Sequence, residues 1–138
     1  MKAVGVLSHV TPKAWPLIED WVRAALKRAK ADCSAEDVRE QLADKRMQLW
    51  LAWDGTQAKG CCITELVHTA RGMNCNLVVV AGVDFKAWRP LTEAIKEWAR
   101  WKGCARLEAS GRAGWERLVA DDGWRKVRTT IEMDLSDG

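Results

Sequence analysis

Hydrophobic and polar positions recur with two distinct periods in the second half of this 138-residue chain. Leu77–Ala81 is a continuous apolar run rich in β-branched residues, which is typical of a strand buried on both faces. From Trp88 the apolar residues recur at helical spacing up to Gly103, where a left-handed residue can end a helix. Cys104–Ser110 then has the character of a second strand. This order predicts a βαβ unit, whose two strands are parallel and joined by a right-handed connection.

The remaining segments predict further elements around this unit. Thr11 and Pro12 favour a helix start with Thr11 as the N-cap, and Ser34 to Asp37 has the spacing of a capping box before a second helix. The alternation also predicts four more strands, at Ala3–His9, Met47–Trp53, Ala58–His68 and Trp124–Leu135. The resulting order, β-α-α-β-β-β-α-β-α-β, predicts a single α/β domain over residues 1–138, with a mixed sheet and helices on both faces.

The amino-acid composition argues against several classes of function. The net charge of +3 is too small to indicate a dedicated nucleic-acid binder, and the two histidines lie too far apart for a zinc site. Five cysteines without a Cys-x-x-Cys pair indicate reduced thiols that act as small apolar residues. The sequence shows no segment long and apolar enough to predict a membrane span, and we expect an intracellular protein. Nine tryptophans and no tyrosine are the unusual feature, since no phenol can act as an acid or base.

The order of elements resembles the GNAT (Gcn5-related N-acetyltransferase) fold. The segment from Gly111 to Trp124 is similar to the fourth helix of that fold, which closes with a Leu-Tyr-x-x-x-Gly-Phe pattern. The chain also resembles the small GNAT-like proteins encoded among the virion and assembly genes of tailed bacteriophages. A protein of that kind is expected in the cytoplasm where it is made, and virion association is a further expectation.

The GNAT resemblance implies where acetyl-CoA would bind. In active members the coenzyme lies where the two central parallel strands separate, and a glycine-rich loop at the start of the third helix holds its pyrophosphate. Here only Gly82 could serve as a loop glycine, Asp84 would repel a phosphate and is expected to cap the helix, and Pro90 lacks an N–H donor. The remaining cofactor candidates are Gly82, Val83, Lys86 and Arg89, with the backbone amides from Val83 to Lys86 as donors.

The catalytic residues implied by the resemblance are also incomplete. Val119 stands where the family places the tyrosine that protonates the leaving thiolate, although a thiolate leaves without strict need of an acid. Glu65 and His68 on the third sheet strand remain as candidate general bases if the protein is an enzyme. Active relatives usually end in two strands, and this chain has the pattern of one, so part of the acceptor wall is missing.

The tryptophans suggest a protein-binding surface. Most of them should fill the core, but nine are more than a domain of this size can bury completely. Tryptophan and arginine are enriched at interface hot spots. We expect a contact patch at Trp101 with Arg100, just before Gly103, and a second candidate at Trp21.

Three functions are therefore considered. The first is a degenerate, non-catalytic GNAT-like domain that binds a protein partner or associates with itself, without a cofactor or metal. The alternative is an acyl-CoA-dependent N-acetyltransferase with an atypical pyrophosphate loop. The third is a nucleic-acid-binding module that would use five cations near the end of the chain: Arg112, Arg117, Arg125, Lys126 and Arg128. Carboxylates lie between these cations and weaken the local positive potential.

Overall fold

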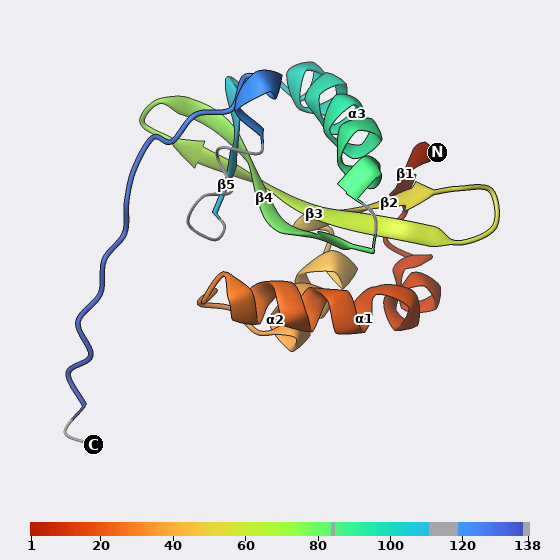
Figure 1. Cartoon of the computed structure of the whole chain (residues 1–138), viewed down its shortest axis with the longest axis horizontal. Coiled ribbons are helices and arrows are strands. Elements are labelled where there is room, and N and C mark those ends of the chain that lie inside the picture. Colours follow the sequence, from red (N-terminus) through yellow and green to blue (C-terminus); the bar gives the residue numbers. More distant parts are fainter. Residues whose placement is uncertain (84, 111–118, 137–138) are drawn as a thin grey trace.

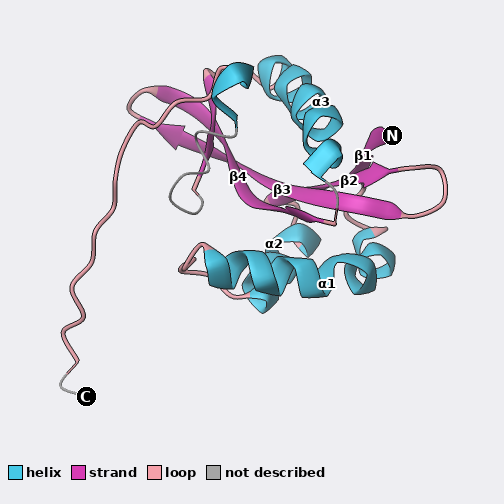
Figure 2. Cartoon of the chain, in the orientation of Figure 1, coloured by secondary structure: helices cyan, strands magenta, loops and turns pink. Residues whose placement is uncertain are grey.

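A single mixed sheet forms the middle of the molecule (Figures 1 and 2). The computed structural model describes all residues except 84, 111–118 and 137–138. The strands follow one another across the sheet in sequence order, as β1 (Lys2–Val6), β2 (Met47–Trp53), β3 (Ala58–Thr69), β4 (Gly72–Gly82) and β5 (Arg106–Ala109). Neighbours from β1 to β4 are antiparallel, whereas β4 and β5 are parallel. The predicted mixed sheet and its central βαβ unit are confirmed.

Helices cover both faces of this sheet. The helices α1 (Thr11–Arg28) and α2 (Ala35–Ala43) lie on one face, and α3 (Trp88–Trp101) lies on the other (Figure 1). Each face has its own apolar core, because side chains alternate between the two sides of a strand. On β3, for example, Ile63 packs in the α1 and α2 core, whereas Cys62 packs in the α3 core.

The helix ends follow local sequence signals with one correction. The capping box at α2 is present, since the Ser34 hydroxyl accepts from the Asp37 N–H and the Asp37 carboxylate accepts from the Ser34 N–H. Gly103 follows α3 with φ of +88°, as expected for a residue that ends a helix. Thr11, however, is the first residue of α1 and Val10 is its N-cap, because the chain already turns at Leu7, whose carbonyl accepts from the Thr11 hydroxyl.

The last predicted strand does not form. Residues 124–136 belong to no helix or strand and run away from the sheet as an extended segment (Figure 1). A strand needs a neighbour for its backbone N–H and C=O groups, and alternation of side chains does not supply one. The predicted fourth helix falls largely on residues outside the described ones, and its described end is one 3-10 turn, η2 (Ala120–Asp122). None of the helices in the described residues has the length and apolar character needed to cross a bilayer.

Candidate functional site

The strands β4 and β5 separate halfway along β4. Their parallel pairing joins Asn74–Leu77 to Arg106–Ala109, whereas β4 continues to Gly82. The β3–β4 register shifts here, because Ile63 pairs with Val79 and Thr64 pairs with Leu77, which makes Val78 an extra residue on β4. A bulge of this kind bends the strand that carries it. In the described ladder, the edge of β4 beyond Leu77 is therefore not covered by β5.

The turn after β4 is tightly packed against β3. A Cβ atom on Gly82 would lie 2.5 Å from the Lys59 carbonyl oxygen and 2.6 Å from the Gly60 Cα atom. The next residue, Val83, donates its N–H to the same Lys59 carbonyl at 3.0 Å. Close contact between the β3 and β4 backbones therefore explains the glycine at position 82. The Val83 N–H, which was expected to donate to the coenzyme, already donates to the Lys59 carbonyl.

The start of α3 carries the two expected cations. A 3-10 turn, η1 (Phe85–Ala87), precedes the helix, and the N-cap is Ala87, which makes no side-chain cap. The expected cap by Asp84, the residue just before η1, falls on a residue outside the described ones. Arg89 donates to the Asp122 carboxylate of η2 at 3.2 Å, so this guanidinium is already bonded to an anion within the chain.

Aromatic packing joins the same two segments. The rings of Trp88 at the start of α3 and Trp124 after η2 have centroids 5.8 Å apart at an angle of 49°. Val119, which replaces the family's acid tyrosine, is only 1% exposed and belongs to the apolar core on the α3 face. The side of the β4–β5 opening next to α3 is thus closed by a ring contact, an ion pair and a buried valine.

These residues do not fit the pyrophosphate of acetyl-CoA. A glycine-rich anion loop needs N–H groups that point outward and glycines that let a phosphate approach. Here the Val83 N–H is bonded within the chain, Arg89 is paired with Asp122, and Pro90 has no N–H. Two hollows of the described chain lie elsewhere, one beside β5 and one between α1 and α2.

The two candidate bases lie on opposite faces of β3. Glu65 pairs with Met47 and Asn76 and is half-buried, whereas His68 is exposed and pairs with Met73 near the strand end. Residues three apart in a strand point to opposite sides of the sheet. Glu65 lies on the face covered by α1 and α2, close enough to Cys33 to affect it. The pKa of Cys33 is raised by burial first, then by the charge of Asp37 and then by that of Glu65. The structure therefore does not bring Glu65 and His68 to one site.

The cysteines offer no nucleophile in the core. All five are free thiols. Burial raises the pKa of Cys61 and of Cys75 to about 12, so both stay protonated at neutral pH, and the thiolate is the reactive form. In the described part of the chain, no group of three His, Cys, Asp or Glu side chains is placed to hold a metal ion.

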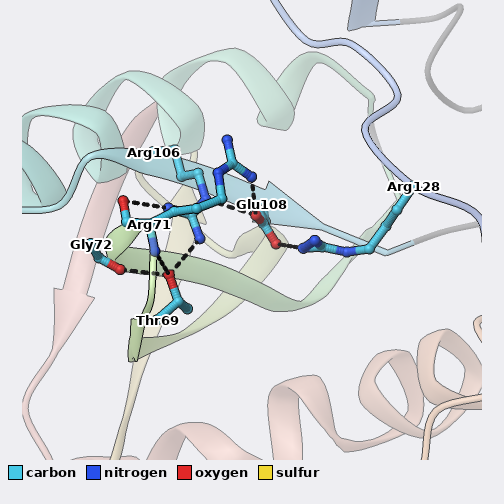
Figure 3. Close-up of polar contacts among 6 residues, drawn as sticks. All are labelled: Thr69, Arg71, Gly72, Arg106, Glu108 and Arg128. Atoms are coloured by element: carbon cyan, nitrogen blue, oxygen red, sulfur yellow. Dashed lines mark hydrogen bonds and ion pairs between the residues drawn. The ribbon is translucent and has the colours of Figure 1, made fainter.

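A cluster of arginines surrounds one carboxylate beside β5 (Figure 3). The Arg106 Nε donates to Glu108 at 2.8 Å, and Arg128 from the extended segment also donates to Glu108. Arg106 reaches the Thr69 hydroxyl as well, at 2.9 Å. We call Thr69, Arg71, Arg106, Glu108 and Arg128 the arginine cluster. Hydrogen bonds from Arg106 first, and then from Arg128, lower the pKa of Glu108 below its ordinary value.

The arginine cluster lines an open hollow of about 470 Å³. Asn74 also lines it, is 5% exposed, and has a buried side-chain oxygen without a hydrogen-bond partner among the described residues. Sequence reasoning did not identify this hollow. The available signal was the alternation of Arg106 and Glu108 on one short strand, because such residues share a face and sit beside Asn74 and Asn76 on β4.

The expected interface residues differ in exposure. Trp101 is 78% exposed at the end of α3, and the Lys102 ammonium lies 5.0 Å from its ring centroid. Arg100 is exposed next to it. Trp21 is only half-exposed and packs against the core beneath α1. The geometry of an exposed anchor is thus present at Trp101 and absent at Trp21.

Comparison with known proteins establishes the fold. The structure aligns with one described as a probable acetyltransferase at a TM-score of 0.72 and 15% identity, covering 100% of both chains. An aminoglycoside acetyltransferase from an uncultured soil metagenomic sample, in complex with sisomicin, aligns at 0.70 and 13% identity, covering 98% of this chain and 96% of the other. The aminoglycoside N-acetyltransferase AAC(6')-Iy in complex with CoA aligns at 0.72 and 12% identity, covering 96% and 93%.

No protein-family model matches the chain. No curated protein matches its sequence either. At identities this low the structural likeness shows a common fold, and activity does not follow from it. The domain has the GNAT fold that the order of its elements predicted.

The contact at Gly82 gives the first prediction. Gly82→Ala should lower the free energy of unfolding by about 1–3 kcal/mol, because the new methyl group overlaps the β3 backbone. Gly5→Ala is the matched control, since its added Cβ would come no closer to a neighbour than 3.4 Å, to the Trp50 ring. Urea denaturation of the three proteins measures the difference. If Gly82→Ala is as stable as the wild type, the glycine has another role.

Glu108 gives a prediction with a defined pH dependence. Glu108→Gln should lower the free energy of unfolding by about 1–3 kcal/mol at pH 7, because the largely buried Arg106 loses its charged partner. A carboxylate whose folded pKa is lowered contributes stability above its unfolded pKa, about 4.3, and loses it as the pH falls through the folded pKa. The difference between wild type and variant in urea denaturation should therefore shrink below pH 4. A difference that stays constant to pH 2 would contradict this role.

Proposed function

We propose that this GNAT-fold domain is a protein-binding or assembly component that carries out no acyl transfer. The observation that supports it most is the closure of the β4–β5 opening on the α3 side. There the Arg89–Asp122 ion pair and the Trp88–Trp124 contact occupy the groups that would otherwise meet a coenzyme. The resemblance to small GNAT-like proteins of tailed bacteriophages, some of them virion components, fits such a role.

The closure is favoured over an open crevice by ordinary packing energetics. Trp88 is 6% exposed, so opening the site would return a large apolar ring to water. Burial of apolar surface contributes roughly 25 cal/mol per Å², and an aromatic side chain buries more than 150 Å². A coenzyme would have to compensate for this loss as well as for the broken ion pair.

The exposed patch at the end of α3 supports the binding role. Most of the Trp101 side chain is exposed to solvent. The neighbouring Arg100 and Lys102 are cations, so a complementary partner would carry acidic or aromatic groups at this position. Exposed tryptophan beside arginine has the composition of an interface hot spot. Trp21 is left out of this proposal because it packs against the core.

The alternative is an acyl-CoA-dependent N-acetyltransferase. The bulge at Val78 and the uncovered edge of β4 favour it, because a separated pair of parallel strands is where the family places acetyl-CoA. The similar structures also include acetyltransferases, one of them in complex with CoA. This alternative would use Glu65 or His68 as the general base. It would also require the contacts at Trp124 and Asp122 to open.

Acetyl-CoA binding separates the two functions. We expect the melting temperature of the full chain to stay unchanged at millimolar acetyl-CoA, because the closed opening offers the ligand no site. A ligand that binds only the folded state at a hundred times its Kd would add about 2.7 kcal/mol of stability. A coenzyme-binding acetyltransferase assayed beside it serves as the positive control. Saturable stabilisation at micromolar ligand, or thiol release with amine acceptors, would establish the alternative.

The patch at Trp101 is tested by substitution. Trp101→Ser should weaken association of the chain, measured by sedimentation velocity at rising concentration, by at least tenfold in Kd, because a hot-spot residue contributes 2 kcal/mol or more. Leu17→Ser on α1, where Leu17 is 56% exposed, is the matched control for loss of an exposed apolar side chain. Both variants should unfold like the wild type. If all three proteins associate with the same Kd, Trp101 is not part of the interface.

A further inference from the structure

The extended segment after η2 has two distinct faces. We call residues 124–135 the C-terminal segment. Its odd-numbered positions from 127 onward are mostly apolar and exposed to solvent, with Val127 at 54% and Ile131, Met133 and Leu135 between 82% and 89%. Its even-numbered positions from 126 to 134 are polar. This is the pattern of a strand with one apolar face, yet the segment has no strand beside it in the described structure.

The polar face carries an ordered set of charges. Reading along it, two cations, Lys126 and Arg128, precede Thr130, and two carboxylates, Glu132 and Asp134, follow it. The two halves are therefore mirror images in position and opposite in sign. An antiparallel copy of the same segment, centred on Thr130, would be complementary to it at every charged position of this polar face.

We propose that two copies of this chain pair their C-terminal segments as antiparallel strands about a two-fold axis at Thr130. In this register Lys126 lies opposite Asp134 of the second copy and Arg128 lies opposite Glu132 of the second copy, each pair occurring twice. On the other face Val127 lies opposite Met133, and Thr129 lies opposite Ile131. Such an interface uses the same surface on both copies, which is the symmetry of most homodimers.

Other arrangements satisfy the charges less well. Sliding the strands by two residues in either direction leaves half of the ion pairs, and sliding by one places polar side chains on the apolar face. A parallel pair would set like charges side by side, which is destabilising. The segment also cannot fold on itself into a hairpin, because Trp124–Leu135 contains no glycine, proline or asparagine to form a tight turn.

Contacts with the rest of the domain already hold the first part of the C-terminal segment in place. Trp124 is fixed against Trp88, and Arg128 donates to Glu108 on β5, so the first part of the segment is already held beside the sheet. A segment held in an extended form loses less conformational entropy on binding than a mobile one. This inference is independent of whether the domain binds acetyl-CoA and of the patch at Trp101.

Charge exchange at one pair tests the proposal. Lys126→Asp and Asp134→Lys leave Arg128 and its contact with Glu108 in place, and each places two like-charge pairs in the dimer. Each single variant should weaken dimerisation in sedimentation equilibrium at low salt by about tenfold. The double variant, and an equimolar mixture of the two single variants, should regain wild-type association because both restore the opposite charges. Equal weakening in the double variant and the mixture would overturn the register.

A crosslink tests the position of the axis. Roughly 5 Å separates the Cα atoms of directly opposed residues in an antiparallel pair, within the range that a disulfide spans. Thr130→Cys should therefore form a covalent dimer under mild oxidation, whereas Ser136→Cys should not exceed the wild type, which controls for the native thiols. The Trp101→Ser change should not alter this crosslink. If the wild type is monomeric and Thr130→Cys forms no crosslink, self-pairing is overturned. The C-terminal segment would then pair with a strand of another protein.

Discussion

The contact between the β3 and β4 backbones at Gly60 and Gly82 determines how the second half of the chain is arranged. Gly60 is also closely packed, since a Cβ there would lie 3.0 Å from the Ala87 Cβ atom, although Gly82 is the tighter of the two positions. The Val83 N–H then donates to the Lys59 carbonyl at the start of β3, just before η1 and α3. The start of α3 is thereby placed where Trp88 and Arg89 meet the segment that follows β5. The contact at Gly82 thus precedes the ring contact and the ion pair that join the start of α3 to the segment around η2.

Most of the fold could be predicted from the sequence because its signals are local. Alternation at Met47–Trp53 and Ala58–His68, the capping box at Ser34, and the glycine at the end of α3 each depend on residues close in sequence. The apolar run at Leu77–Ala81 also indicated a strand buried on both faces, and β4 is such a strand. The central parallel pair followed from the helix between its strands, since a short connection cannot join parallel strands.

The site was harder to predict because it depends on contacts between distant residues. The expectation for Asp84 falls on a residue outside the described ones, whereas the described contacts beside α3 join Arg89 to Asp122 and Trp88 to Trp124, each pair about 35 residues apart in sequence. The arginine cluster likewise unites β5, the turn after β3 and the extended segment. Glu65 and His68 were grouped by proximity in sequence, but the period of a strand separates them. No local pattern encodes such pairings.

The unpaired last segment and the closed opening have a common origin in the shortness of β5. With four residues, β5 can pair only with the first half of β4, and the chain leaves the sheet at Ser110. On the α3 side, the β4 residues Leu77 and Val80 belong instead to one apolar cluster with Trp88, Val119 and Trp124. For the same reason the C-terminal segment has only the short strand β5 beside it, where its Arg128 side chain donates to Glu108. Its apolar face stays in water within one chain, at a cost of about 25 cal/mol per Å². A neighbour that covers this face would lower that cost, and the order of charges about Thr130 favours a copy of the segment itself as the strand that pairs with it.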